Sequence, residues 1–339
     1  MTNLKIPRIE YLDVVKGIGI LCVVSGHMLH TASSVFYLFH MPLFFFISGF
    51  LFSRDENQKR YVRNKLIQLI IPYCTFLILL YPFLFVPQLK TASAKEISLI
   101  FFRAILGGRK LAAVCTVFWF ITCLWATQVV FNYLICRFSM QQILIISGIF
   151  LAFAYINATF FQNVYIPWNL NVVFFAEPVF LLGYLFKKYD FANKIPVWIC
   201  IIFSLAGVYL SNKYPSISLN MKNAQYGIPV VSLFLSISII ISLFYIGKLI
   251  CKVPLLKKTL ELPGEASLVI MYSHQLIRGL IHTYTPLNAP VIYVICIIAG
   301  IALYRLLLTN KLLRIFFLGS KKDFQEQFER TPPIQLSVH

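Results

Sequence analysis

The stretch that decides the fold is DVVKGIGILCVVSGHMLH, residues 13–30. It is apolar enough to cross a bilayer as a helix, yet it carries Lys16 near one end and His27 near the other. Eleven positions at about 100° per residue make about three full turns, so both side chains share one helix face. At about 1.5 Å per residue they are separated by roughly 16 Å along the axis. We therefore expect a membrane helix that holds two polar groups on one face at two depths.

The composition places the whole chain in the membrane. Of the 339 residues, 59% are hydrophobic and only 12% are charged, whereas a soluble domain is about one quarter charged. The apolar residues form blocks of about 20, which is the length a spanning helix needs. We predict an all-α, polytopic helical bundle with about ten spans, and an interfacial or re-entrant segment at 95–108. The predicted spans lie near residues 11–31, 36–53, 62–87, 115–136, 142–160, 171–187, 195–211, 226–247, 266–284 and 290–313.

The basic residues set the predicted orientation. Connections that an N-in, C-in topology places inside hold 20 Lys and Arg residues, and those placed outside hold seven. This bias follows the positive-inside rule, so the net charge of +18 indicates topology and not a nucleic-acid partner. We predict a transmembrane domain over residues 1–317 and a polar, partly disordered cytoplasmic tail over 318–339.

Other ionisable residues also lie within the predicted spans, where charge is costly and usually marks function. His40 opens the second span at a depth similar to that of His27. Glu177 precedes Pro178, and His274 and Arg278 are four residues apart and share a face of the ninth span. We predict that these groups gather around one site.

Each of these residues also has a purely structural interpretation. Lys16 can extend to the membrane surface, and His27 can be hydrogen-bonded by a neighbouring helix. His40 can be an interfacial histidine, while Glu177 can be the structural partner of Arg278 or of a histidine. The sequence leaves these alternatives open.

Motifs for other chemistries are missing from the sequence. It contains no Walker loop, no G-x-S-x-G, no H-E-x-x-H and no cluster of carboxylates that would predict a metal site. Any catalysis would therefore depend on histidine, and we expect no metal.

Five segments resemble the acyltransferase-3 family of integral membrane acyltransferases, close to its fucose 4-O-acetylase-like branch. In order they are YLDVVKGIGILCVVSGH at 11–27, FHMPLFFFISGFLF at 39–52, FWFITCLW at 118–125, FLLGYLFKK at 180–188 and GEASLVIMYSHQLI at 264–277. The first two are specific, and the series covers nearly the whole chain. The family pattern is a basic residue followed, after ten intervening residues, by histidine; many members have arginine where this chain has Lys16.

The resemblance implies transfer of an acetyl or other acyl group from cytoplasmic acyl-CoA to a hydroxyl of a glycan or lipid-linked sugar outside the inner (plasma) membrane. A CoA phosphate would pair with Lys16, and the pantetheine arm would pass along the face beside Gly19 and Gly26. His27 would be the general base for the acceptor hydroxyl or the nucleophile that forms an acyl-histidine. We expect acyl-CoA (acetyl-CoA above all), the acceptor and membrane lipids as partners.

Further residues are assigned by their position in the chain, and the family motifs do not extend to Glu177. The outer loops would select the acceptor, because tryptophan and amide side chains suit a sugar, although such residues are also common at membrane interfaces. We predict catalytic roles for His40 and Glu177 and acceptor-binding roles for Trp119, Trp168, Asn169, His274 and Arg278.

Two other functions compete with acyl transfer. A proton-coupled transporter would use His27, His40, Glu177 and His274 as a relay, but its usual inverted repeats and paired broken helices are not evident in the sequence. A non-catalytic membrane scaffold is the third interpretation, and it leaves the costly ionisable groups within the spans unexplained.

Overall fold

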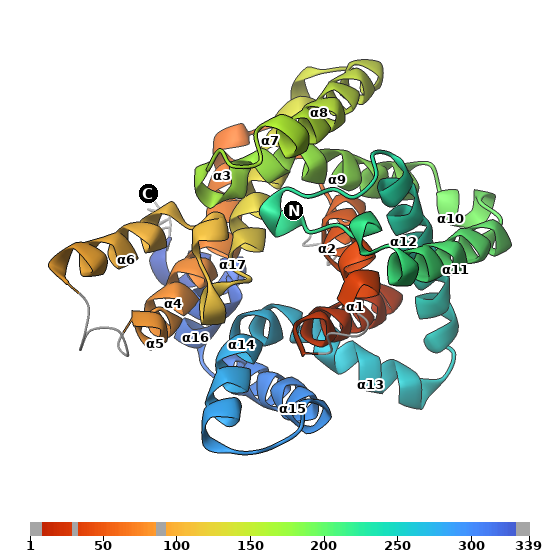
Figure 1. The fold of residues 1–339 in the computed structure, drawn as a ribbon. Coiled ribbons are helices and arrows are strands. Elements are labelled where there is room, and N and C mark those ends of the chain that lie inside the picture. Colours follow the sequence, from red (N-terminus) through yellow and green to blue (C-terminus); the bar gives the residue numbers. More distant parts are fainter. Residues whose placement is uncertain (1–8, 29–32, 86–92, 330–339) are drawn as a thin grey trace, which may run out of the picture.

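A computed structural model describes residues 9–28, 33–85 and 93–329, and over these ranges the chain is a bundle of helices. The β-pairing found there is one isolated bridge between Asn220 and Gln225. In Figure 1, α1 and α2 lie near the middle, α7–α9 on one side, α14 and α15 on another, and α4, α16 and α17 on a third. The predicted all-α polytopic bundle is confirmed.

Eight of the ten predicted spans correspond to helices that are long and apolar enough to cross a membrane. The other two are α11, with 17 residues, and α14, whose stretch from Ser273 to Arg278 is polar. The predicted span at 290–313 is wrong at its end, because α15 stops at Leu308 and a separate helix follows. The main helices are α1 Glu10–Met28, α2 Ser33–Phe50, α7 Trp119–Arg137, α8 Met140–Phe160, α9 Val173–Lys188, α11 Val197–Lys213, α12 Val231–Ile250, α13 Pro254–Glu265, α14 Ser267–Tyr284 and α15 Ala289–Leu308.

The third span is continuous but irregular. It runs through α3 Gln58–Lys65, a π-helical turn η2 at Leu66–Ile70, α4 Ile71–Leu80 and α5 Pro82–Phe85. Pro72 has no N–H to donate to the carbonyl of Gln68, which lies four residues earlier, and π-turns often accompany such local breaks in the ladder. The irregular turn carries Leu69 towards the interior of the bundle, where it lines the cavity described below.

The bundle has two ends that differ in their connections. We call one the outer end; it carries α6 Ala94–Leu106, the short helices η4 Gly108–Lys110, η5 Ala113–Cys115 and η6 Pro167–Val172, and the loop 214–230 with η7 Pro215–Ile217 and η8 Met221–Asn223. The name follows the predicted orientation. Helix α6 begins with a capping box between Ser93 and Glu96 and exposes Leu99, Phe102 and Ile105. At 13 residues it is too short to span, which agrees with an interfacial segment.

Glycines bring pairs of helices into backbone contact. A Cβ on Gly17 would lie 1.9 Å from the carbonyl oxygen of Leu260, and one on Gly264 would lie 1.9 Å from that of Asp13. Helix α2 crosses α9 in the same reciprocal way, because a Cβ on Gly49 or Gly183 would collide with the facing backbone at 1.9 or 2.0 Å. Small residues commonly allow such close approach in membranes, where packing drives helix association. These two crossings fix α1 and α2, the helices that carry Lys16, His27 and His40.

The C-terminal tail starts with ordered structure. Helix α16 Lys311–Leu318 packs on α4, and α17 Lys321–Phe328 follows after Gly319. Arg314 donates to both carboxylate oxygens of Asp323 at 2.8 and 3.0 Å, and this ion pair lowers the pKa of the Asp323 carboxyl well below its ordinary range. Residues 321–328 of the tail that was predicted to be partly disordered form a helix, and residues 330–339 lie outside the described part.

The glycine contacts give the first testable prediction. Gly183→Ala places a methyl group against the backbone of α2, and overpacking of this kind costs about 1–3 kcal/mol or more. We expect a clear drop in the thermal unfolding temperature of the detergent-solubilised protein. Gly148→Ala is the matched control, because a Cβ there meets no atom within 4 Å. Equal unfolding temperatures for the two variants would contradict the packing role.

Candidate functional site

A central cavity of about 390 Å³ lies between the helices, towards the outer end. Its wall on α1 is formed by Ile20, Val23 and His27, which continue the helix face that begins at Lys16. The remaining walls come from α2, η2, η4, α7, α14 and the loop around η8. The face predicted from the spacing of Lys16 and His27 is therefore the face that borders the cavity.

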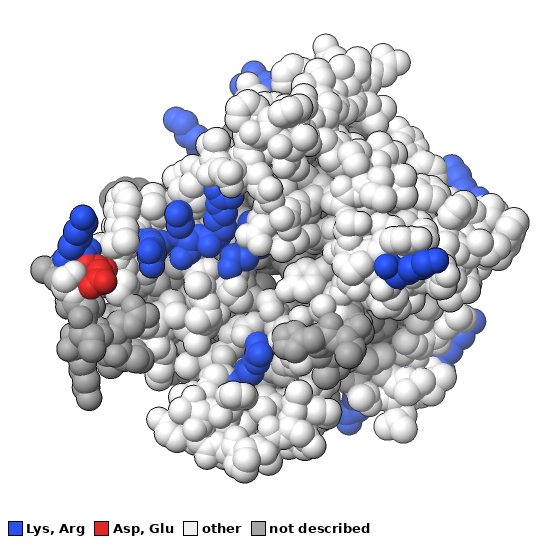
Figure 2. Space-filling model, viewed as in Figure 1, with Lys and Arg blue, Asp and Glu red and all other residues white. Residues whose placement is uncertain are grey.

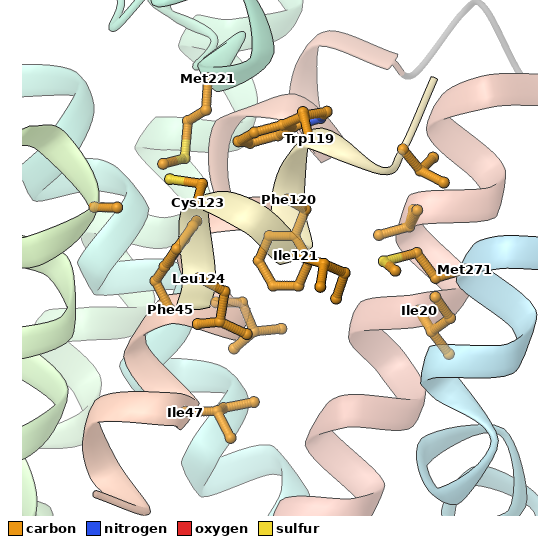
Figure 3. Packing of buried hydrophobic residues seen from close by; sticks show 14 of the residues in the cluster. Ile20, Phe45, Ile47, Trp119, Phe120, Ile121, Cys123, Leu124, Met221 and Met271 are labelled. Carbon is orange, nitrogen blue, oxygen red and sulfur yellow. The ribbon is translucent and has the colours of Figure 1, made fainter. Parts of the chain in front are cut away.

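The start of α7 forms the opposite wall. Figure 3 shows Trp119 close to Met221 of η8, while Phe120 and Ile121 lie on the side towards Ile20 and Met271. These side chains are largely buried. Trp119, for which we predict an acceptor-binding role, is therefore a buried residue that lines the cavity.

Three histidines from three helices gather at the outer part of this cavity. The ring of His27 lies 5.4 Å from that of His274, centroid to centroid, and 6.4 Å from that of Tyr37. Tyr37 in turn contacts His40, with 5.1 Å between their centroids. His27, Tyr37 and His40 line the cavity, while His274 is 0% exposed behind His27. The predicted gathering of these histidines is what the structure shows.

Backbone carbonyls fix the tautomers of two of these rings when they are neutral. His40 Nδ1 lies 2.5 Å from the carbonyl oxygen of Phe36, and His274 Nδ1 lies 2.9 Å from that of Ile270. A carbonyl only accepts, so each Nδ1 carries the proton and each Nε2 is left as an acceptor. The Nε2 of His274 is buried and has no hydrogen-bond partner among the described residues. The Nε2 atom of His274 is therefore a hydrogen-bond acceptor that lies behind the ring of His27.

Lys16 lies one helical turn inward from Ile20, beyond the described cavity lining. Its Nζ is 2.5 Å from Oδ1 of Asp13, and its side chain is 26% exposed. The carboxylate of Asp13 therefore orients the ammonium of Lys16. Lys16 and His27 therefore occupy two depths of one face, with Ile20 and Val23 between them.

The two glycines assigned to the donor face the neighbouring helix. A Cβ on Gly19 would lie 2.8 Å from Leu43 and 3.2 Å from Phe44, and one on Gly26 would lie 3.6 Å from Phe36. Both are buried against α2 and are not among the residues that line the cavity. Both glycines therefore allow α1 to pack closely on α2. The face shared by Lys16 and His27 is lined by side chains and not by glycines.

Glu177 lies apart from the histidines. It is 0% exposed, and its Oε1 accepts a hydrogen bond of 3.0 Å from the hydroxyl of Ser147 on α8. Glu177 is not among the described residues that line the cavity. The expected pairing with Arg278 or a histidine is wrong in this structure, because Glu177 points into the α8–α9 contact.

Arg278 lies one turn beyond His274 on α14 and is half-buried. It does not line the cavity. Arg278 therefore lies beside His274 on α14, as the spacing of the two residues predicts.

Trp168 and Asn169 form the framework of the outer wall. Both adopt left-handed backbone angles, with φ of 58° and 57°, a conformation that is unusual for tryptophan and more common for asparagine. Asn169 is 2% exposed. Its Oδ1 accepts from the backbone N–H of Arg109 at 2.7 Å, and its Nδ2 donates to the carbonyl of Lys222 at 2.7 Å. Asn169 thus ties three outer segments together from within the wall.

Sequence reasoning missed the cations of this outer wall. Arg109 and Lys222 both line the cavity. Lys222 Nζ donates to the carbonyl of Leu111 at 2.8 Å and to Oγ1 of Thr116 at 2.6 Å. Burial lowers the pKa of the Lys222 ammonium to about 8. One feature of the sequence could have identified these cations. They are basic residues in outer connections, where the positive-inside rule predicts few basic residues.

A second hollow, which we call the outer groove, adjoins the cavity. It has a volume of about 580 Å³ and shares Tyr37 and Asn220 with the cavity lining. Its other residues come mainly from α8 and the 214–230 loop and are rich in hydroxyl and amide groups. Among them are Ser34, Tyr155, Thr159, Gln162, Ser216, Ser218 and Gln225.

Comparison with known proteins places this arrangement in a family. A family model described as an acyltransferase domain, that of the acyltransferase-3 family, matches residues 9–308. This range includes every helix that lines the cavity. No curated protein and no solved structure gives a match.

The position of Asn169 gives the second prediction. Asn169→Ala removes two buried hydrogen bonds, each with a net contribution of about 1 kcal/mol, and adds a Cβ-bearing residue without a polar side chain at positive φ. We expect a lower unfolding temperature than for Asn169→Gly, which loses the same bonds but tolerates the backbone angle. The exposed Asn163 provides the control Asn163→Ala. An unchanged unfolding temperature for Asn169→Ala would contradict its structural role.

Proposed function

Because the chain belongs to the acyltransferase-3 family, we propose that it transfers an acetyl group from cytoplasmic acetyl-CoA to a hydroxyl of a glycan or lipid-linked sugar outside the membrane. The reaction would take place in the central cavity, and the membrane would be the inner (plasma) membrane. The branch related to fucose 4-O-acetylases stays a prediction from the sequence motifs.

The single observation that carries this proposal is the position of His27. It lies on the cavity wall near the predicted outer end, on the same α1 face as Lys16 near the inner end. A donor with an anionic head and a long arm fits this arrangement. Its phosphates would pair with Lys16, while its thioester would reach the cavity beside His27.

The proposed transfer needs one base and no metal. A neutral ring nitrogen of His27 accepts the proton of the acceptor hydroxyl, and the oxygen attacks the thioester carbonyl carbon. The C–O bond forms, the tetrahedral intermediate collapses, and the C–S bond breaks. The departing CoA thiolate takes the proton from His27, which leaves the acetyl ester, free CoA thiol and neutral imidazole.

His274 supports the first of these steps. Its Nε2 is an unpartnered acceptor behind His27. A His27 N–H turned towards that nitrogen would leave the other His27 nitrogen as the base facing the cavity. An acyl-histidine route is the alternative, in which a His27 ring nitrogen attacks the thioester carbon and the C–S bond breaks, so that CoA leaves as the thiol. The acceptor hydroxyl then attacks the acetyl-imidazole, its proton passes to the ring, and neutral His27 is regenerated.

The geometry weighs against a proton relay of a transporter. Such a relay would connect Glu177 with the three histidines, but the carboxylate of Glu177 binds Ser147 in a different helix contact. The histidines instead cluster at one part of the cavity, where His27 and His40 line the wall and His274 lies behind His27.

The histidine prediction is tested with radiolabelled acetyl-CoA in membranes. His27→Ala removes the base, and general bases contribute about 10²–10⁴-fold to rate, so we expect transfer to fall by at least about 100-fold. The control is His282→Ala, since His282 is exposed in the last turn of α14 and lies outside the cavity lining. Wild-type transfer by a stably inserted His27→Ala protein would refute the proposal.

A parallel prediction concerns the donor. Lys16→Ala removes the cation at the inner end of the α1 face, and we expect KM for acetyl-CoA to rise about tenfold with a smaller change in kcat, whereas Lys16→Arg keeps most of the affinity. Lys257→Ala is the matched control, because Lys257 also pairs with a carboxylate, that of Glu10, near the inner end. An equal rise in KM for Lys257→Ala would remove the specific role of Lys16.

A further inference from the structure

Basic residues outnumber acidic residues at the outer end of the bundle. The sequence of the outer connections contains one acidic residue, Glu96, which is used in the capping box of α6. Figure 2 shows the outer face with basic residues gathered over it and acidic atoms only at its left edge. The basic residues of the described outer connections are Lys95, Arg103, Arg109, Lys110, Lys213 and Lys222.

Arg109 and Lys222 differ from the other cations in that they line the central cavity. Both are half-buried, and within the described part of the chain their hydrogen-bond acceptors are neutral. The guanidinium of Arg109 donates to the carbonyls of Gln162 and Asn163 at 2.6 and 3.2 Å, while Lys222 uses two of its three N–H groups on Leu111 and Thr116. Each side chain therefore keeps donors for a ligand.

Several cations at the inner end of the bundle pair with carboxylates, which the two cations of the outer wall do not do among the residues that the structure describes. Lys16, Lys257, Arg60 and Arg314 each have an aspartate or glutamate partner. By contrast, no aspartate or glutamate occurs among the described residues that line the central cavity or the outer groove. Two uncompensated positive charges thus border a cavity, an arrangement that favours an anionic ligand.

We propose, resting on the acyl transfer proposed above, that the acceptor is an anionic saccharide whose acid group, a carboxylate or a phosphate, binds Arg109 and Lys222 at the outer wall of the central cavity. The hydroxyl to be acetylated then lies on the same sugar or its neighbour, beside His27.

The outer groove gives the rest of the saccharide a place to lie. It adjoins the cavity at Tyr37 and Asn220, which line both, and offers neutral hydroxyl and amide groups of the kind that hydrogen-bond sugar hydroxyls. Tyr155 adds an aromatic side chain to its lining. The acid group would bind at the cations, and further sugars would extend outward through the groove.

The acceptor class is tested in membranes of the native cells with radiolabelled acetyl-CoA. After transfer, the labelled saccharides are released from lipid and separated on an anion exchanger. We expect the label in the retained, acidic fraction. Treatment with an acid phosphatase separates the two sources, because retention that is lost indicates a phosphate and retention that survives indicates a carboxylate. Label in the neutral, unretained fraction would overturn the proposal.

Variants test the assignment of the cations. Lys222→Gln should raise KM for the acidic acceptor about tenfold or more, as expected for loss of a hydrogen bond to a charged group, and Lys222→Arg should restore most of the affinity. Lys213→Gln is the control, because Lys213 is an exposed cation at the same end but outside the cavity lining. An equal effect of Lys213→Gln, or no difference between Lys222→Gln and Lys222→Arg, would overturn the proposal.

These outcomes are distinguishable from failure of acyl transfer itself. If His27-dependent labelling occurs but the label is neutral, only the anionic acceptor is refuted. If His27→Ala leaves labelling unchanged, the acyl transfer proposed for this cavity fails, and the anionic acceptor fails with it.

Discussion

Backbone contact between helices at glycine residues positions the two helices that carry Lys16, His27 and His40. In a membrane, apolar side chains gain little by leaving lipid, so helices associate through close packing. Gly17 and Gly264 seat α1 on α13, and Gly49 and Gly183 seat α2 on α9, each with no room for a Cβ. Because both helices are fixed in this way, His27 of α1 and His40 of α2 line the same cavity.

Packing also explains which residues the sequence could place and which it could not. The three-turn spacing of Lys16 and His27 is a local property of one helix, and it correctly predicted a shared face, with Ile20 and Val23 between them on the cavity wall. The position of His40 near His27 followed from their similar predicted depths, and the shared face of His274 and Arg278 followed from their spacing on one helix. The sequence therefore predicts which residues share a face of a single helix.

The sequence does not predict which residues on different helices contact each other, because a helical pattern determines the face on which a residue lies but not the helix that packs against that face. Glu177 was expected near Arg278 and instead binds Ser147. Gly19 was expected beside a passage and packs on Leu43. The outer wall was missed for a different reason: its segments at Arg109, Asn169 and Lys222 have no periodicity, and they are joined by hydrogen bonds between residues more than 50 positions apart in sequence.

The contrast between the two ends of the bundle links the fold to the proposed chemistry. The cation of the inner end of α1, Lys16, is balanced by Asp13 and stays partly exposed, so an incoming phosphate competes with a carboxylate and can leave again. At the outer wall, Lys222 has no carboxylate partner among the described residues, and burial lowers its pKa to about 8. An anion bound there would favour the charged ammonium against this effect of burial. The exchangeable pair would suit the proposed CoA donor, which has to be released after each transfer, and the uncompensated cations would suit the proposed anionic acceptor.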